Sequence, residues 1–130
     1  MSTPNPVTFP ALTKGFSWTP STTGEGGSPL PDGETQSGST VGIRPDGDAT
    51  FGPAHYKYLI TTSGTKSELS VTDANWMAAK VPPGNYWADV DQTDILNGQS
   101  ATSAWSGKEV PFSIPFPIVK PAPPSGFSAA

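Results

Sequence analysis

The chain contains no cysteine and a single histidine among its 130 residues. The missing cysteines exclude disulfide bonds, thiolate metal sites and thiol catalysis. The side chain most often used as a general base occurs only once, at His55, and no Gly-x-Ser-x-Gly motif marks a nucleophilic serine. We therefore expect a protein that is not an enzyme and holds no cofactor or metal, with a structural or solvent-exposed role for His55.

Charge is also scarce, because charged residues make up only 14% of the chain. The net charge of −4 and the isoelectric point of about 4.6 argue against binding to nucleic acid. No apolar run approaches the roughly 18 residues of a membrane helix. The first residues lack a basic region and an apolar stretch, so we expect no export signal and synthesis in the cytoplasm.

Long segments without glycine or proline are missing as well. The chain has 14 glycines and 16 prolines, and the longest stretch free of both is Thr65–Val81. A helix bundle cannot be built from segments this short. Four Trp, three Tyr and six Phe nevertheless supply the apolar surface that folding needs. These features predict an all-β domain of short strands and long turns.

Alternation of apolar and polar residues locates the strands. Pro45–Asp48 and Asn97–Gly98 have the composition of tight turns, and a loop rich in glycine and proline covers residues 21–38. Asp73 either caps a short helix that runs through Ala79, or the same residues continue a strand. The predicted strands cover residues 14–19, 39–44, 56–62, 68–71, 86–91, 102–107 and 110–114.

Two groups of aspartates are the only acidic clusters, Asp46 with Asp48 and Asp89 with Asp91 and Asp94. Calcium sites need six to eight oxygen ligands, and the twelve-residue calcium loop needs a glutamate at its last position. Neither cluster has that spacing or that glutamate. We interpret them as a hairpin turn and a solvated strand face.

The segment Val81-Pro-Pro-Gly-Asn-Tyr86 resembles the corner between the fifth and sixth strands of a fibronectin type III domain. In that family a Pro-Gly turn leads into a tyrosine that starts an alternating strand. Phe16–Pro20 is similar to the second strand of such domains, with its core tryptophan followed by proline. Asp94–Gly98 and Thr102–Ser106 are similar to the loop and the last strand, and Pro121–Phe127 to a linker between modules.

This resemblance implies an antiparallel fibronectin III or immunoglobulin-like β-sandwich over residues 13–114. Residues 1–12 and 115–130 are expected to form extended, proline-rich arms. The loop over residues 21–38 is longer than the family usually has, and Asp73–Lys80 lies where the family has plain strand. An immunoglobulin-like sandwich with another strand order is the alternative.

Alternation assigns the inward and outward side chains. If Tyr86 points inward, Trp87 points outward, and an outward tryptophan binds a partner protein, stacks on a sugar or is covered by its own chain. The predicted core consists of Phe16, Trp18, Val41, Ile43, Tyr58, Ile60, Tyr86, Ala88 and Val90. The candidate interface or glycan contacts are Trp76, Trp87, Trp105, Phe116 and Phe127.

Single, acidic, cysteine-free sandwich domains of this kind resemble accessory proteins of tailed bacteriophage particles. The resemblance implies a non-catalytic structural or adhesive virion protein, made in the host cytoplasm, that decorates the capsid or belongs to the tail or the head–tail junction. Its partners would be capsid or tail subunits in a multi-copy assembly, with weak glycan binding in addition. The alternative is a carbohydrate-binding module on a secreted or surface assembly. Fold alone does not decide between them.

Overall fold

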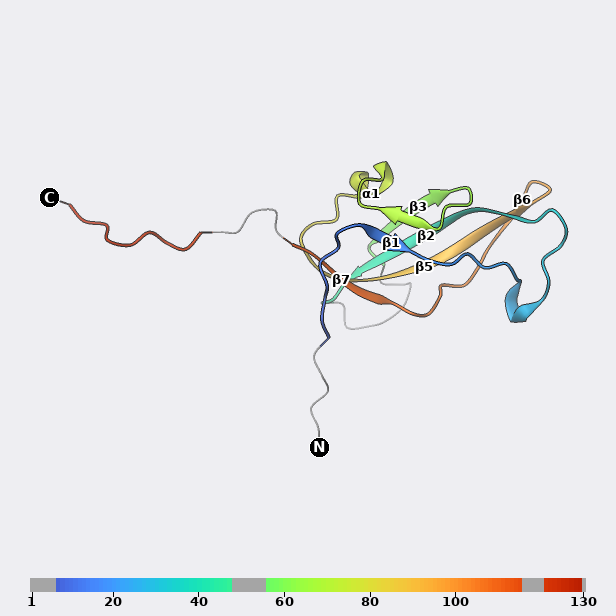
Figure 1. The fold of residues 1–130 in the computed structure, drawn as a ribbon, viewed down its shortest axis with the longest axis horizontal. Coiled ribbons are helices and arrows are strands. Elements are labelled where there is room, and N and C mark those ends of the chain that lie inside the picture. Colours follow the sequence, from blue (N-terminus) through green and yellow to red (C-terminus); the bar gives the residue numbers. More distant parts are fainter. Residues whose placement is uncertain (1–6, 48–55, 116–120, 130) are drawn as a thin grey trace, which may run out of the picture.

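The described part of the chain contains seven strands, one short α-helix and one 3-10 helix η1 (Glu25–Gly27), and Figure 1 shows their arrangement. The computed structural model describes residues 7–47, 56–115 and 121–129. The fold is all-β, as predicted from the composition, with a single α-helix α1 (Ala74–Ala79) between the fourth and fifth strands. The strands are β1 (Gly15–Ser17), β2 (Thr35–Pro45), β3 (Tyr58–Ser63), β4 (Glu68–Ser70), β5 (Gly84–Leu96), β6 (Gln99–Thr102) and β7 (Val110–Ile114).

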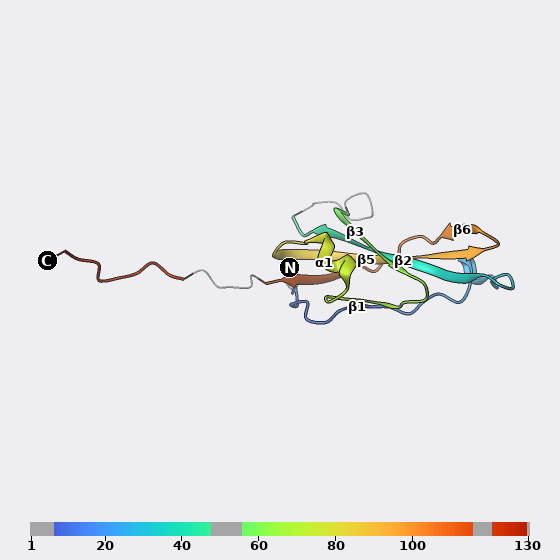
Figure 2. The ribbon, with the colours of Figure 1, turned by 90° about the horizontal axis from the view of Figure 1, so that it is seen from above.

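The strands form two antiparallel sheets of unequal size. The larger sheet has the order β3-β2-β5, and both β6 and β7 pair with the remaining edge of β5. Strand β7 pairs with Gly84–Ala88, and β6 pairs with Thr93–Leu96, so two short strands share one long neighbour. The smaller sheet consists of β1 and β4 alone. Figure 2 shows β1 on one side of the larger sheet.

The hydrophobic core draws residues from both sheets. Five of the predicted core residues are buried, and Phe16, Trp18, Tyr58 and Val90 are partly buried and pack against them. Leu69 and Phe112 are buried as well, although the sequence analysis did not place them in the core. The buried apolar residues are Val41, Ile43, Ile60, Leu69, Tyr86, Ala88 and Phe112.

Tyr86 links the start of β5 to the turn before it. Its hydroxyl donates a hydrogen bond to the Pro82 carbonyl at 2.5 Å. Its ring stacks on Phe112 with centroids 5.5 Å apart and meets Tyr58 edge to face at 6.4 Å. A buried tyrosine needs a partner for its hydroxyl, and the bent Pro-Pro-Gly segment supplies one four residues upstream. The predicted corner therefore has a specific hydrogen bond that fixes its shape.

Residues Ala74–Ala79 are helical, so of the two alternatives the capped helix is correct. The Asp73 carboxylate accepts a hydrogen bond from the Asn75 amide at 2.8 Å, as an N-cap residue does. Lys80 ends the helix in the left-handed conformation with φ of 50°. The Asn75 side chain donates to the Thr61 carbonyl on β3 at 2.8 Å. This bond occupies part of the free edge of β3.

Three predicted boundaries were wrong. Strand β5 ends at Leu96, five residues past the predicted end at residue 91, because residues 92–96 pair with β2 and β6. Strand β2 begins at Thr35, inside the predicted loop, because small polar residues there pair with β5 although they show no hydrophobic alternation. The returning strand β6 covers Gln99–Thr102 instead of residues 102–107. Asn97 and Gly98 both have positive φ, 52° and 78°, so a two-residue turn reverses the chain at once.

The two ends of the chain differ in their contacts. Residues 10–12 run parallel to β7, since Leu12 donates to the Ser113 carbonyl at 2.9 Å and Ser113 donates to the Pro10 carbonyl at 2.8 Å. This part of the predicted N-terminal arm therefore lies against the sheet. Residues 121–129 form no helix or strand and are exposed throughout. Figures 1 and 2 both show them extending away from the sheets.

Candidate functional site

A groove of about 660 Å³ opens along one side of the domain. Its walls come from residues 16–21, in and after β1, and from residues 103–110, and buried Val41 and Ala88 form its apolar floor. The volume lies in the range of about 300–1,000 Å³ that is usual for ligand pockets. Phe16, Trp18 and Val110 also line this space, which we call the groove.

The second wall exists because β6 and β7 leave a gap along β5. Residues 103–109 cross this gap without forming a strand. Ser103 donates to the Gln92 carbonyl at 2.7 Å, and Ser106 donates to the Val90 carbonyl at 3.0 Å. These bonds satisfy the edge of β5 where no strand pairs with it.

Asp89 holds this crossing segment in place. Its side chain is buried, and one carboxylate oxygen accepts from the Val90 amide at 2.7 Å and from the Ser106 hydroxyl. The other oxygen accepts from the Gly107 amide at 3.0 Å. A buried carboxylate needs such donors to offset the loss of water. The interpretation of Asp89 as part of a solvated strand face was therefore wrong, because its carboxylate is buried and hydrogen-bonded within the chain.

Gln92 joins the two walls at one end of the groove. Its side-chain oxygen accepts from the Ser21 amide at 2.8 Å, and its side-chain nitrogen donates to the Ser21 carbonyl at 3.1 Å. The same nitrogen donates to Asp94 at 2.9 Å. The Gln92 side chain thus bonds to both backbone groups of Ser21, as the backbone of a neighbouring strand would. It fixes the segment after β1 against β5.

Asp91 lines the groove next to Val90 and has a raised pKa. Burial raises its pKa above the usual 3.8, the hydrogen bond from the Thr40 amide opposes that rise, and the charge of Asp89 adds to it. The Thr40 amide lies 2.9 Å from the carboxylate. The raised pKa reflects partial burial beside a second acid, and the bond to β2 gives Asp91 a structural partner.

Trp18 lies in the wall of the groove with its backbone amide bonded to the Ser67 carbonyl at 2.9 Å. Its indole nitrogen is buried and has no hydrogen-bond partner among the described residues, and the same holds for the Thr62 hydroxyl. Unpaired buried polar atoms cost stability.

A second group of side chains covers the opposite face of the larger sheet, and we call it the outer cluster. Arg44 is buried there at 2% exposure, and its guanidinium bonds to both carboxylate oxygens of Glu109, at 2.8 and 3.0 Å. The Glu109 carboxylate also raises the pKa of Arg44. The guanidinium carbon lies 5.5 Å from the centre of the Trp87 ring. This ion pair holds residues 103–109 from the face opposite the groove.

The aromatic half of the outer cluster packs over a glycine. Tyr56 and Trp105 meet edge to face at 4.8 Å. A Cβ atom at Gly42 would lie 2.5 Å from the Tyr56 ring and 3.0 Å from Trp105. Burial raises the pKa of Tyr56. Gly42 is thus the position that allows these two rings to approach the sheet.

The three candidate contact tryptophans are partly buried, and each has an aromatic partner in the chain. Trp87 meets Phe9 at 5.6 Å and donates from its indole nitrogen to Asp46 at 2.8 Å. Trp76 meets Phe16 at 5.9 Å, and Trp105 meets Tyr56 as described. Asp46, one of the predicted turn acids, therefore serves as an acceptor for Trp87.

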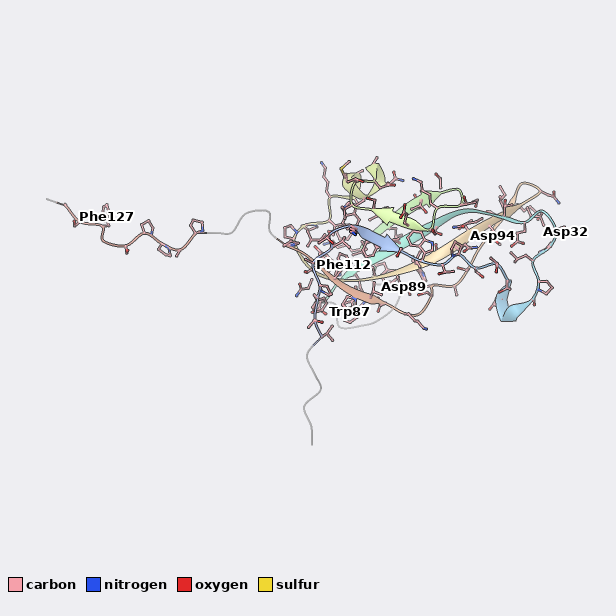
Figure 3. All side chains as sticks on the ribbon, viewed as in Figure 1. Asp32, Trp87, Asp89, Asp94, Phe112 and Phe127 are labelled. Carbon is pink, nitrogen blue, oxygen red and sulfur yellow. The ribbon has the colours of Figure 1, made fainter. Side chains whose placement is uncertain are left out.

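Of the remaining candidate residues, only Phe127 lies within the described part of the chain. Phe127 is fully exposed, and Figure 3 shows it far from Asp89 and Phe112. Phe116, His55 and Asp48 lie outside the described residues. The described residues hold no group of three or more histidine, cysteine or acidic side chains that could bind a metal ion. Within those same residues, no helix is long and apolar enough to cross a membrane.

Comparison with protein-family models, with curated proteins and with solved structures found no match for this chain. Its hydroxyls and carboxylates at the groove are largely engaged in holding residues 103–109 and Ser21. Sequence reasoning missed this role for Asp89 and also missed the buried Arg44–Glu109 pair. The only signal for the pair was an arginine in a strand whose neighbours are apolar.

Proposed function

We propose that the chain is a fibronectin III or immunoglobulin-like sandwich. The larger sheet supports this, because its order β3-β2-β5 with β6 and β7 corresponds to the C′-C-F-G sheet of variable-type immunoglobulin domains. In the same correspondence β1 and β4 take the places of strands B and E. The Tyr86 hydroxyl bonded to the Pro82 carbonyl corresponds to the tyrosine corner before strand F.

The proposed function is that of a non-catalytic structural component of a bacteriophage particle, attached to capsid or tail subunits in many copies. The observation that carries it is the fully exposed Phe127 on a proline-rich segment that extends from a small, acidic domain. An aromatic side chain on an extended, proline-rich segment suits binding to a groove on another protein. The virion setting rests on the resemblance of such domains to phage accessory proteins.

Glycan binding is the less favoured function. A sugar platform requires an aromatic face open to solvent, whereas Trp76, Trp87 and Trp105 are each partly buried with an aromatic neighbour. Trp87 also has Arg44 within 5.5 Å of its ring centre. These contacts favour the third alternative for the tryptophans, cover by their own chain. Binding to a glycan array that is lost on replacing Trp87 with alanine would reverse this preference.

Particle attachment tests the proposal directly. The full chain and a version ending at Pro115 are each supplied to a culture that produces the particles, and purified particles are analysed for both. We expect the full chain on the particles and the shortened chain in the soluble fraction, with the same melting temperature for both. Leu59→Ser, an exposed change on β3 far from the C-terminal segment in sequence, is the matched control and should attach normally. Normal attachment of the shortened chain would contradict the proposal.

A further inference from the structure

We propose that the groove of one copy binds residues Pro121–Ala129 of a second copy. This inference rests on the proposed multi-copy function and names the contact that joins neighbouring copies. It joins two features of the chain. One is an apolar groove along an incomplete sheet, and the other is an exposed segment with an uncovered aromatic side chain.

The groove has the character of a peptide site. The smaller sheet has two strands of three residues each, against five strands in the larger sheet. No described strand pairs with the edge of β1 opposite β4. The smaller sheet therefore covers only part of the apolar floor of the groove, and Val110 in the other wall is 48% exposed. An extended segment placed here would cover apolar surface that the domain itself leaves open.

Residues 121–129 have the matching chemistry. Pro121, Pro123 and Pro124 lack an amide hydrogen and favour the extended polyproline conformation, so this segment is poorly suited to add a β-strand. Proline-rich segments bind instead in grooves lined by aromatic rings, as Phe16 and Trp18 line this one. The segment carries no charged side chain, and Phe127 provides an anchor that is 100% exposed.

A second copy is the occupant that the arrangement favours. The segment leaves the domain beyond the end of β7 and extends away from the sheets in both views (Figures 1 and 2). Its own groove lies beside Val110, at the opposite end of the same strand. A contact between the C-terminal segment of one copy and the groove of the next is head-to-tail, so it repeats along a line or closes into a ring.

Sedimentation velocity of the full chain over a wide concentration series measures this contact. We expect reversible association that Phe127→Ser weakens roughly 10–100-fold, the effect of losing one buried aromatic anchor. Val110→Glu, which places a charge in the exposed wall of the groove, should weaken association similarly. Leu59→Glu, on a side chain 62% exposed and outside the groove, is the control and should associate normally. A monomer at every concentration would overturn the inference.

Photocrosslinking identifies the occupant. A photoreactive phenylalanine at position 127, in an equal mixture of ¹⁴N- and ¹⁵N-labelled full chains, should give mixed-isotope crosslinks to peptides containing Trp18 or Val110. Crosslinks within one chain would mean that the segment folds back on its own domain, and crosslinks elsewhere would exclude the groove, so either result overturns the inference. If the wild-type chain stays monomeric in solution and still attaches to particles, this inference fails and the proposed virion function stands.

Discussion

Replacing Tyr86 tests the corner from which β5 starts. Tyr86→Phe keeps the ring, which is 4% exposed and stacked on Phe112, and removes only the hydrogen bond to the Pro82 carbonyl. Loss of a hydrogen bond of this kind costs about 1 kcal/mol. For a chain of 130 residues this corresponds to a fall of about 4 °C in melting temperature.

Tyr86→Ala removes the ring as well. Burial of an aromatic side chain removes ~150–250 Å² from water, which at ~25 cal/mol per Å² is roughly 4–6 kcal/mol. Substitutions of this size in protein cores cost about 3–5 kcal/mol, so we expect a loss in that range. Because small domains are stable by only about 5–15 kcal/mol, this loss removes a large share of the free energy of unfolding and should lower the unfolding midpoint clearly.

Urea unfolding followed by tryptophan fluorescence and far-UV circular dichroism measures both losses. Tyr58→Phe is the matched control, since no described residue accepts a hydrogen bond from the Tyr58 hydroxyl and the ring contact at 6.4 Å is kept. It should unfold at the wild-type midpoint. A Tyr86→Phe variant as stable as wild type, together with an alanine variant that loses less than about 1 kcal/mol, would refute the importance of the corner.

Three further substitutions probe the outer cluster and an acidic pair. Arg44→Leu leaves the partly buried Glu109 carboxylate without its partner and should lower the free energy of unfolding in urea by about 3–5 kcal/mol. Replacing both residues with leucine should recover part of that loss. Gly42→Ala forces a Cβ to within 2.5 Å of an aromatic ring and should cost about 1–3 kcal/mol by the same assay. A hydrogen bond with Asp94 raises the pKa of Glu34, so the folded state favours the protonated form of this carboxyl group. Above the raised pKa the two carboxylates repel each other, and this repulsion is relieved as the pH falls through that pKa. Glu34→Gln should therefore raise the melting temperature at pH 7, with the gain shrinking toward pH 4.

Each of these substitutions has a result that would contradict its explanation. Gly47→Ala meets no atom within 4 Å and should be neutral, so equal effects at Gly42 and Gly47 would rule out the steric explanation. Full stability of Arg44→Leu would mean that the buried ion pair contributes nothing. A gain for Glu34→Gln that is the same at pH 4 and pH 7 would show that its cause is not the titration of the carboxyl pair.

Local sequence signals located the elements whose causes are local. Asn97-Gly98 provided the positive φ angles of a two-residue turn, and Asp73 provided a helix cap. Tyr58–Ser63 and Val110–Ile114 were predicted within two residues of their observed limits, because their side chains alternate. Pairing between distant segments had no such signal. The parallel contact of residues 10–12 with β7 depends on backbone groups that any sequence carries.

The candidate site was less accessible to sequence reasoning for the same reason. Trp87 was correctly placed on a face opposite Tyr86, but its covering partners Phe9 and Asp46 are 78 and 41 residues away along the chain. Asp89 was interpreted as a solvated residue because charge alone does not reveal three donors supplied by Val90 and residues 106–107. The groove itself results from a gap between β6 and β7 that only the register of β5 defines.

Counting this chain in purified particles tests the central proposal most directly. Quantitative mass spectrometry of particles from the producing culture would measure the number of copies relative to the major shell protein. The account predicts a fixed, reproducible copy number, with hundreds of copies indicating a capsid decoration protein and a dozen or fewer indicating the tail or the head–tail junction. Absence of the chain from particles that are otherwise complete would contradict it.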